Sequence, residues 1–228
     1  MAAEAAEAAG ADLTVSSNEA LRLAEVLCAR LCHDVAGSLG ALIGSLELAT
    51  EKDGGMVEEA LELASATGRA LAARLRLLRA AWAGTDAPLD LPTLVDLARG
   101  LPRRRLELDL SAMPSGTEFD PATGRVVLNL VLLAAEALPA GGRVWLERTE
   151  ESLLIGVNGA HSAWPAALGT ALVGPAKIEG PRELQAPLTV LLARAGGFSL
   201  SLLMPAGPSL PAGAPPLVLR MPAGCALP

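Results

Sequence analysis

The chain contains two histidines, and their sequence contexts differ. His161 lies in the segment 159–162 (Gly-Ala-His-Ser), which is typical of a turn and has no cysteine or carboxylate beside it, so we interpret it as an ordinary surface residue. His33 instead precedes Asp34 in the middle of a long apolar segment with helical spacing. An imidazole that is exposed on a rigid helix and largely neutral at physiological pH can act as a nucleophile. His33 is therefore the first candidate for chemistry in this chain.

Three interpretations of His33 compete. The simplest is a histidine on the solvent-facing side of a helix. A metal site could combine His33 with Cys28 and Cys32, which are four residues apart and share a helical face. However, His33 points about 100° away from Cys32 and no fourth ligand is evident in the sequence, so small buried thiols explain the cysteines better. The third interpretation is a histidine that accepts a phosphoryl group from a bulky protein partner.

The residues that share a helical face with His33 are unusually small. Gly37, Gly40 and Gly44 follow it at helical spacing. Glycine inside a helix costs about 1 kcal/mol relative to alanine, so three glycines in one stripe indicate that this surface is kept bare. Close helix packing is one explanation, and docking of another protein is the other. The residues of this helix predicted to contact a partner are Arg30, Gly37, Ser38, Gly40, Ala41 and Gly44.

Two long helices are expected to carry these residues. The first spans about 18–52, preceded by the capping-box spacing of Ser16 and Glu19, and its apolar stripe comprises Leu23, Leu27, Leu31, Val35, Leu39, Leu42, Ile43 and Leu46. Residues 53–55 (Asp-Gly-Gly) break this helix, and a second helix spans about 56–83. The two form an antiparallel hairpin. Apolar residues on more than one face predict packing against the rest of the chain or, as we prefer, pairing with a second copy into a four-helix bundle.

The hairpin geometry adds basic residues near His33. If the turn centres near residue 53, position 33 is level with about position 73 of the second helix. Arg69, Arg74 and Arg76 then bracket His33 and are predicted to contact an acidic partner, unless they are simply solvated arginines on an exposed face.

The remaining sequence predicts a different architecture. From residue 89 onward, helical and alternating apolar patterns mix, which favours an α+β domain. Its expected helices cover 91–101, 121–138, 163–173 and 183–194, and its expected strands cover 105–110, 144–147, 153–157, 198–204 and 217–221. The predicted organisation is a disordered tail (1–15), a helical hairpin for dimerisation and histidine phosphotransfer (16–86) and an α/β domain (87–228).

Composition limits the possible partners. The net charge of −7 and an aromatic content of 2% without tyrosine argue against nucleic-acid binding. The mean hydropathy of +0.41 raises the question of a membrane span. The longest stretches without charged residues, 152–176 and 195–219, are interrupted by proline and glycine, so no spanning helix is expected. Three cysteines do not make a disulfide framework, and the acidic N-terminus lacks the features of a signal peptide, so a cytoplasmic protein is expected.

The segment around His33 resembles known phosphotransfer sequences. Residues 30–39 (Arg-Leu-Cys-His-Asp-Val-Ala-Gly-Ser-Leu) are similar to the histidine box of two-component dimerisation domains, in which an acid follows the histidine. Gly37 and Ser38 also match monomeric phosphotransfer domains, which have lysine where this chain has Ala36. Residues 27–34 resemble the ChpT-type histidine phosphotransferases of alphaproteobacterial phosphorelays, which often have proline in place of Ser38.

The resemblance extends into the second half of the chain. Residues 127–142 look like the first helix and turn of a histidine-kinase ATPase domain, with the first asparagine of that pattern at Asn129. The second asparagine, which holds Mg²⁺-ATP in kinases, falls on Leu133. The glycine box is replaced by 157–161 (Val-Asn-Gly-Ala-His), and the lid by 180–187. The resemblance therefore implies a degenerate ATPase-like α/β sandwich without kinase chemistry.

The function implied by this resemblance is a phosphorelay. His33 would carry a phosphoryl group between aspartates of response-regulator receiver domains, one in a hybrid sensor kinase as donor and one in a downstream regulator as acceptor. Asp34 would orient the other imidazole nitrogen, and Arg30 would contact the phosphoryl group. The chain itself would bind no cofactor, because the receiver brings Mg²⁺. The alternatives are an active or phosphatase-type histidine kinase, which must bind nucleotide, and a non-catalytic dimeric adaptor, which would carry no phosphate on His33.

Overall fold

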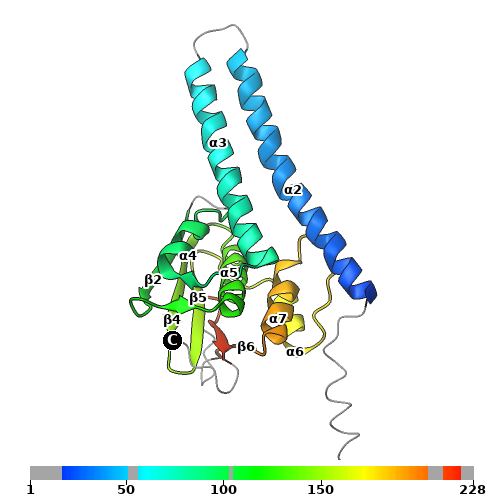
Figure 1. Ribbon diagram of the computed structural model, residues 1–228, viewed down its shortest axis with the longest axis vertical. Helices are drawn as coiled ribbons and strands as arrows, with labels where there is room; N and C mark the ends of the chain where they lie inside the picture. Colours follow the sequence, from blue (N-terminus) through cyan, green and yellow to red (C-terminus); the bar gives the residue numbers. More distant parts are fainter. Residues whose placement is uncertain (1–16, 51–55, 103–104, 205–212, 222–228) are drawn as a thin grey trace, which may run out of the picture.

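The computed structural model describes residues 17–50, 56–102, 105–204 and 213–221. Two long antiparallel helices, α2 (Ser17–Thr50) and α3 (Val57–Leu78), form the predicted hairpin, and α3 continues into a π-helical segment, η1 (Arg79–Ala83) (Figure 1). The predicted tail, Ser16 of the capping pair and the turn at 53–55 lie outside the described residues.

The second half of the chain forms a mixed α/β domain, as the sequence predicts. A five-stranded sheet has the strand order β2-β4-β5-β7-β6, in which β2 is parallel to β4 and the other neighbours are antiparallel. A short pair, β1 and β3, lies apart from it. The strands are β1 (Leu89–Asp90), β2 (Leu106–Ala112), β3 (Glu118–Phe119), β4 (Gly142–Arg148), β5 (Ser152–Asn158), β6 (Ser199–Leu202) and β7 (Leu217–Arg220), and the helices are α4 (Leu91–Ala98), α5 (Pro121–Glu136), α6 (Ala166–Val173) and α7 (Gln185–Ala195).

Helix α5 forms the centre of the domain core. Its first turn is fixed by Asp120, whose carboxylate accepts hydrogen bonds from the backbone N–H groups of Ala122 and Thr123, and by Pro121 at the first helical position. Nearly every residue from Thr123 to Ala135 is buried. This helix packs against the apolar face of the sheet, which presents Val144, Leu146, Leu153, Ile155, Leu217 and Leu219.

The base of the hairpin is part of the same core. Leu77, Leu78 and Ala81, at the end of α3 and in η1, are buried with the residues of α5. The buried side chain of Asn129 donates hydrogen bonds from Nδ2 to the carbonyl oxygen of Ala81 (2.7 Å) and to that of Arg125 (2.8 Å). Because both apolar burial and a buried amide hold η1 against α5, the hairpin has a fixed position on the domain.

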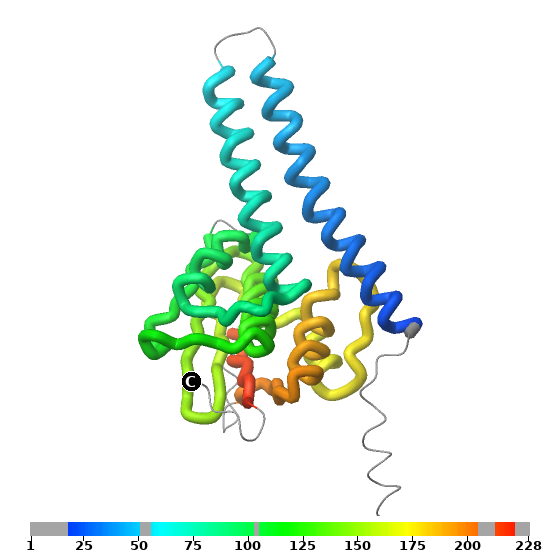
Figure 2. Tube along the Cα trace, in the orientation of Figure 1, coloured from blue at the N-terminus to red at the C-terminus, as the bar shows by residue number. Residues whose placement is uncertain are grey.

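Helix α2 makes a second contact with the domain. The two hairpin helices separate toward their base, where α3 runs into α5 and α2 passes beside α7 (Figure 2). There Val26 packs against Leu184 and Leu188, and Arg22 donates from Nη2 to the carbonyl oxygen of Glu179 (3.0 Å). The segment 179–188 therefore supports the lower part of α2.

One property of α2 differs from the sequence expectation. Its residues Asn18–Thr50 are long and apolar enough to cross a membrane by length and composition, and only 6% of the most apolar window is buried in the single chain. Length and composition do not separate a membrane span from a bundle helix. The helix carries Arg30 and Asp34, whose side chains form ion pairs with residues of α3 and α5, so this part of α2 is fixed to the rest of the protein.

Candidate functional site

His33 lies on the exposed surface of α2, just above the C-terminal domain. Its side chain is 82% exposed, so both a partner protein and solvent can reach the imidazole. The hairpin register agrees with the predicted one, because Arg74 of α3 donates a hydrogen bond to Asp34, the residue next to His33.

Asp34 is the centre of an ion-pair cluster. Its Oδ2 accepts a 2.8 Å hydrogen bond from Nη2 of Arg74, and its Oδ1 lies 3.3 Å from Nε of Arg30. The same Oδ1 lies 3.5 Å from Nδ1 of His33. The contact between Asp34 and one imidazole nitrogen, which the sequence interpretation expected, is present in the structure.

The charge state of Asp34 follows from these contacts. Burial acts to raise the pKa of its carboxyl, but the hydrogen bond and charge of Arg74, together with the charge of Arg30, outweigh burial and hold the pKa below its ordinary value. Asp34 is therefore a carboxylate at neutral pH and can accept a hydrogen bond from the imidazole.

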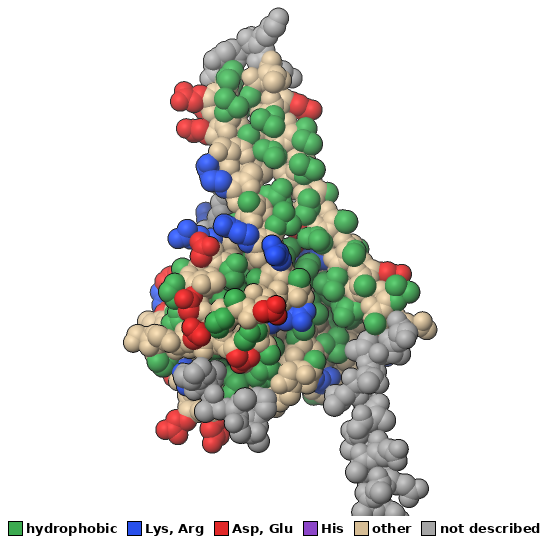
Figure 3. Space-filling model, in the orientation of Figure 1, with side chains coloured by type: hydrophobic (Ala, Val, Ile, Leu, Met, Phe, Trp, Pro, Cys, Tyr) green, Lys and Arg blue, Asp and Glu red, His purple; other side chains and the backbone are tan. Residues whose placement is uncertain are grey.

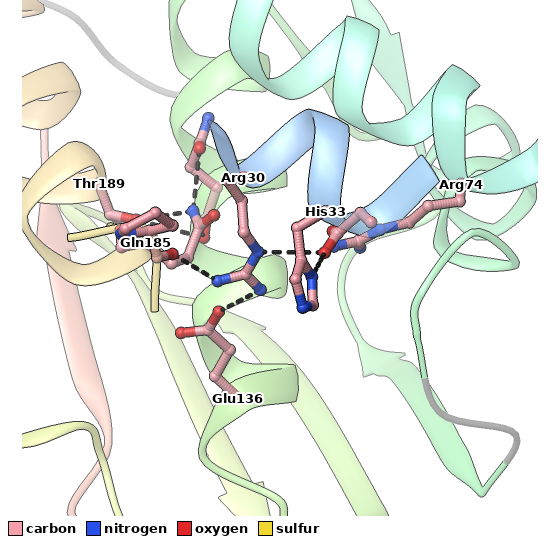
Figure 4. Close-up of polar contacts among 9 residues, drawn as sticks. Arg30, His33, Arg74, Glu136, Gln185 and Thr189 are labelled. Carbon is pink, nitrogen blue, oxygen red and sulfur yellow. Dashed lines mark hydrogen bonds and ion pairs between the residues drawn. The ribbon is translucent and has the colours of Figure 1, made fainter. Parts of the chain in front are cut away.

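Arg30 has a different place from the one predicted. Its guanidinium donates from Nη1 to the carbonyl oxygen of Pro181 (2.8 Å) and from Nη2 to Oε1 of Glu136 (3.2 Å), in addition to its contact with Asp34 (Figure 4). Only 20% of the side chain is exposed. With three acceptors already bound, Arg30 joins α2 to the C-terminal domain, and the structure does not direct it toward an incoming phosphoryl group.

Glu136 is a residue of this cluster that sequence reasoning missed. It ends α5, and its side chain is 24% exposed. Burial raises the pKa of its carboxyl above the ordinary value, although the charge and hydrogen bond of Arg30 oppose this effect. One signal was available, because Glu136 is the single acid in the mostly apolar segment 121–138.

The three arginines predicted on α3 do not act together. Arg74 is 12% exposed and lies beneath His33, where it pairs with Asp34 instead of standing at a docking rim. Arg69 and Arg76 are exposed, but they are turned about 140° and 160° from Arg74 around the helix. Arg69 donates to the hydroxyl of Ser65 (2.6 Å) on its own helix. The prediction that all three bracket His33 is therefore wrong for Arg69 and Arg76.

The glycine stripe is open. A Cβ atom added to Gly37, Gly40 or Gly44 would meet no atom of the described residues within 4 Å. All three lie within about 40° of His33 around the helix. The alternative that these glycines serve close packing between α2 and α3 is thus wrong for the single chain. Of the two other predicted docking residues, Ala41 is exposed and Ser38 is partly buried, with its hydroxyl donating to the carbonyl oxygen of Asp34 (3.4 Å).

A different face of α2 carries exposed apolar residues. Leu39, Ile43 and Leu46 are each 44–48% exposed and are turned about 80–140° from His33. Cys28 and Cys32 share this face and are exposed, so the expectation of buried thiols is wrong for the single chain. Figure 3 shows hydrophobic side chains along both hairpin helices on one side of the molecule. Within the described ranges, no group of three or more His, Cys, Asp or Glu side chains could hold a metal ion.

The positions that the sequence resemblance aligns with nucleotide-binding residues of kinases have structural roles in this protein. Asn129 donates to two carbonyl groups and accepts from Nε2 of Gln185 (3.0 Å), and this network includes Thr189. Leu133 is fully buried in the apolar core. His161 is exposed, as predicted, and lies in a turn with a φ of 58°.

Comparisons with known proteins place this geometry in context. A family model described as the histidine phosphotransferase C-terminal domain matches residues 91–207, half of the chain. The protein phosphotransferase ChpT of Brucella abortus (strain 2308) is 27% identical over 192 residues, which cover 80% of this chain and 90% of that relative. A solved structure of a bacterial phosphotransferase has a TM-score of 0.70 and 25% identity, with 90% of this chain and 97% of that chain covered.

A histidine kinase, AdeS of Acinetobacter baumannii, is also similar, with a TM-score of 0.37 and 14% identity over 85% of this chain and 98% of that one. This similarity is too low to support an argument. The family model and the bacterial phosphotransferase confirm the predicted resemblance to histidine phosphotransferases and the predicted fold class, a long helical hairpin followed by a mixed α/β domain.

The lowered pKa of Asp34 leads to a prediction about acid stability. Ionised Asp34 stabilises the fold above its ordinary pKa of 3.8, and this stabilisation is lost as the pH falls through the lower folded-state value. Asp34→Asn should lower the free energy of unfolding by about 1–2 kcal/mol at neutral pH. Urea unfolding at about pH 7 and about pH 3 should show that the difference from the unmodified protein shrinks in acid.

The matched control is Asp96→Asn. Asp96 pairs with Arg99 on an exposed helical surface, where an ion pair contributes little to stability. This variant should unfold like the unmodified protein at both pH values. A loss for Asp34→Asn that is equally large in acid would contradict the ionic origin of the effect.

Proposed function

The chain belongs to the histidine phosphotransferase family, and from that premise we propose that His33 is the residue that carries the phosphoryl group. The protein is a histidine phosphotransferase of a phosphorelay, and its partners are response regulators or kinases. We propose further that both partners present receiver domains, one of a hybrid sensor kinase as donor and one of a downstream regulator as acceptor, and that the exchange occurs in the cytoplasm without nucleic acid or membrane.

The single observation that carries the assignment of His33 is its environment. The imidazole is exposed, its Nδ1 faces a carboxylate held by two arginines, and an open glycine stripe lies on the same face. A proton on Nδ1 that is directed to Asp34 leaves the lone pair on Nε2, at the opposite end of the ring, to act as the nucleophile.

The proposed reaction is a reversible exchange. The Nε2 lone pair of His33 attacks the phosphorus of an aspartyl phosphate, the bond from phosphorus to the carboxylate oxygen breaks, and the carboxylate leaves with the electron pair. The phosphorylated ring is positively charged while Nδ1 keeps its proton, and the Asp34 carboxylate beside Nδ1 stabilises this charge. An aspartate of the second receiver then attacks phosphorus, and Nε2 recovers its lone pair. We expect the receiver domain to bring Mg²⁺, and this ion would neutralise the charge of the phosphoryl oxygens.

We propose that the chain binds no ATP. The amide of Asn129 is used in a buried structural network, and Leu133 is packed in the core where a kinase has its metal-holding asparagine. These observations favour a phosphotransferase over an active histidine kinase, because the residues at these positions have no free polar group to offer a nucleotide.

We also propose a homodimer formed through the hairpin. The exposed apolar residues of α2 (Leu39, Ile43, Leu46) and of α3 (Leu61, Leu75) are 39–49% exposed in the single chain. Exposed apolar surface that runs along two helices is typical of a face buried by another copy, and the pairing of two hairpins buries it in a four-helix bundle. His33 lies on another face of α2, so it stays exposed in this arrangement.

The first prediction concerns the phosphorylated residue. His33→Gln should reduce acid-labile labelling from a phosphorylated receiver domain to background, because no nucleophilic nitrogen remains at this position. His161→Gln is the matched control and should be labelled like the unmodified protein, since His161 lies in an exposed turn of the other domain. A folded His33→Gln protein with full labelling would rule out this assignment and favour the non-catalytic adaptor.

The second prediction concerns the open stripe. Gly37→Leu places a bulky side chain one turn from His33 and should strongly reduce phosphotransfer, whereas Gly37→Ala should reduce it less. A Cβ atom at this position meets no described residue within 4 Å. Replacing glycine should therefore add up to about 1 kcal/mol of helix stability, and both variants should keep or raise the melting temperature. Transfer at the normal rate by Gly37→Leu, or a sharp fall in its melting temperature, would argue against a docking surface.

The third prediction concerns the dimer. Light scattering should give twice the chain mass of 23.2 kDa at micromolar concentration. Ile43→Glu should give a monomer, because the proposed interface would bury an unpaired charge. Leu63→Glu is the control, since Leu63 is equally exposed (50%) but is turned about 160° from Leu61 on α3. A monomeric unmodified protein, or equal effects of the two variants, would contradict the proposed interface.

A further inference from the structure

We propose that Arg30 and Glu136 are positioning residues for phosphoryl transfer: Glu136 of the C-terminal domain fixes Arg30 of α2, and Arg30 fixes the Asp34 carboxylate that orients the His33 imidazole. This inference rests on the proposed function, because it takes His33 as the phosphoryl acceptor. It gives the C-terminal domain, which has no evident nucleotide chemistry, a direct part in the geometry of the reaction.

The contacts form one continuous series of side chains that joins the C-terminal domain to the hairpin. Oε1 of Glu136 lies 3.2 Å from Nη2 of Arg30, Nε of Arg30 lies 3.3 Å from Oδ1 of Asp34, and the same Oδ1 lies 3.5 Å from Nδ1 of His33 (Figure 4). The carbonyl oxygen of Pro181 accepts from Nη1 of Arg30 at 2.8 Å and fixes the third corner of the guanidinium. The planar fork of arginine suits such a bridge, since one rigid group reaches all three acceptors.

The burial of these side chains indicates that the series of contacts is rigid. Exposure falls from 82% for His33 to 16% for Asp34, 20% for Arg30 and 24% for Glu136. The reactive ring is thus in solvent while the groups behind it are mostly shielded. A partly buried ion pair contributes little net stability compared with apolar packing, whereas it fixes orientation well, so positioning is the better explanation for a carboxylate at the end of an apolar helix.

Charge balance supports the same role. A phosphoryl group adds about two negative charges close to Asp34, and an isolated carboxylate there would repel it. Arg30 and Arg74 neutralise Asp34 from two sides, so it remains a hydrogen-bond acceptor for Nδ1 without presenting a net negative charge. An ionised Glu136 balances the second arginine, and the charges of the four groups behind His33 then sum to zero.

The test uses the full-length protein and a phosphorylated receiver domain. Glu136→Gln and Arg30→Gln should each lower the maximal rate of transfer about tenfold, as expected for a displaced reacting group, with the half-saturating receiver concentration unchanged. The double variant should be no slower than the slower single variant, because both residues act through one chain of contacts. Arg30→Lys should not restore the rate, since an ammonium group cannot reach the three acceptors together.

A spectroscopic measurement separates positioning from a general loss of structure. The nitrogen-15 shifts of the imidazole report which nitrogen carries the proton, and the Nδ1-protonated form of His33 should decrease in Glu136→Gln while the signals of His161 stay unchanged. Arg22→Gln is the matched control, because it removes a bond from α2 to the carbonyl oxygen of Glu179, in the same segment as Pro181, without touching Asp34. If Glu136→Gln does not fold, Glu136→Met is measured in its place.

Normal rates in a folded Glu136 variant would overturn the proposal, as would an equal loss in Arg22→Gln or additive losses in the double variant. These outcomes are distinct from failure of the proposed function, in which the unmodified protein itself would carry no phosphate on His33.

Discussion

The geometry of the site depends on the need to pair Asp34. Helices α2, α3 and α5 meet beneath His33, and each contributes charged side chains that are mostly withdrawn from water. A charge in such a place is tolerated only when it has partners, so the positions of Arg30, Arg74 and Glu136 are mutually constrained. The exposed imidazole rests on this cluster and takes its orientation from it.

The C-terminal domain has a structural role in the site. The side chain of Asn129 is used within the protein, because its amide forms hydrogen bonds to the end of η1 and to α7. The segment that replaces the lid packs under α2 through Leu184 and bonds Arg30 through Pro181. These residues thus hold the hairpin, and the domain acts as a rigid support for the helix that carries His33.

Much of this architecture could be predicted from the sequence because it depends on local patterns. Long helical periodicity defines the hairpin, and equal rise along antiparallel helices places residue 33 level with about residue 73, which the bond between Asp34 and Arg74 confirms. The rotation of each helix about its axis is set by tertiary packing. Arg69 and Arg76 were therefore placed at the right height and on the wrong face. Glu136 was missed because it is 106 positions from Arg30, and no local pattern joins them.

Different faces of α2 have different roles. Near the base, Val26 and Arg30 face the C-terminal domain, and the same side continues upward as His33 and the open glycines. The apolar residues of the proposed dimer interface begin about 80° away. The proposed docking at His33 and the proposed pairing of the hairpins therefore use separate surfaces of one helix. In the proposed dimer, each protomer presents its own histidine outward, so a receiver can bind and leave without separating the helices that hold the two protomers together.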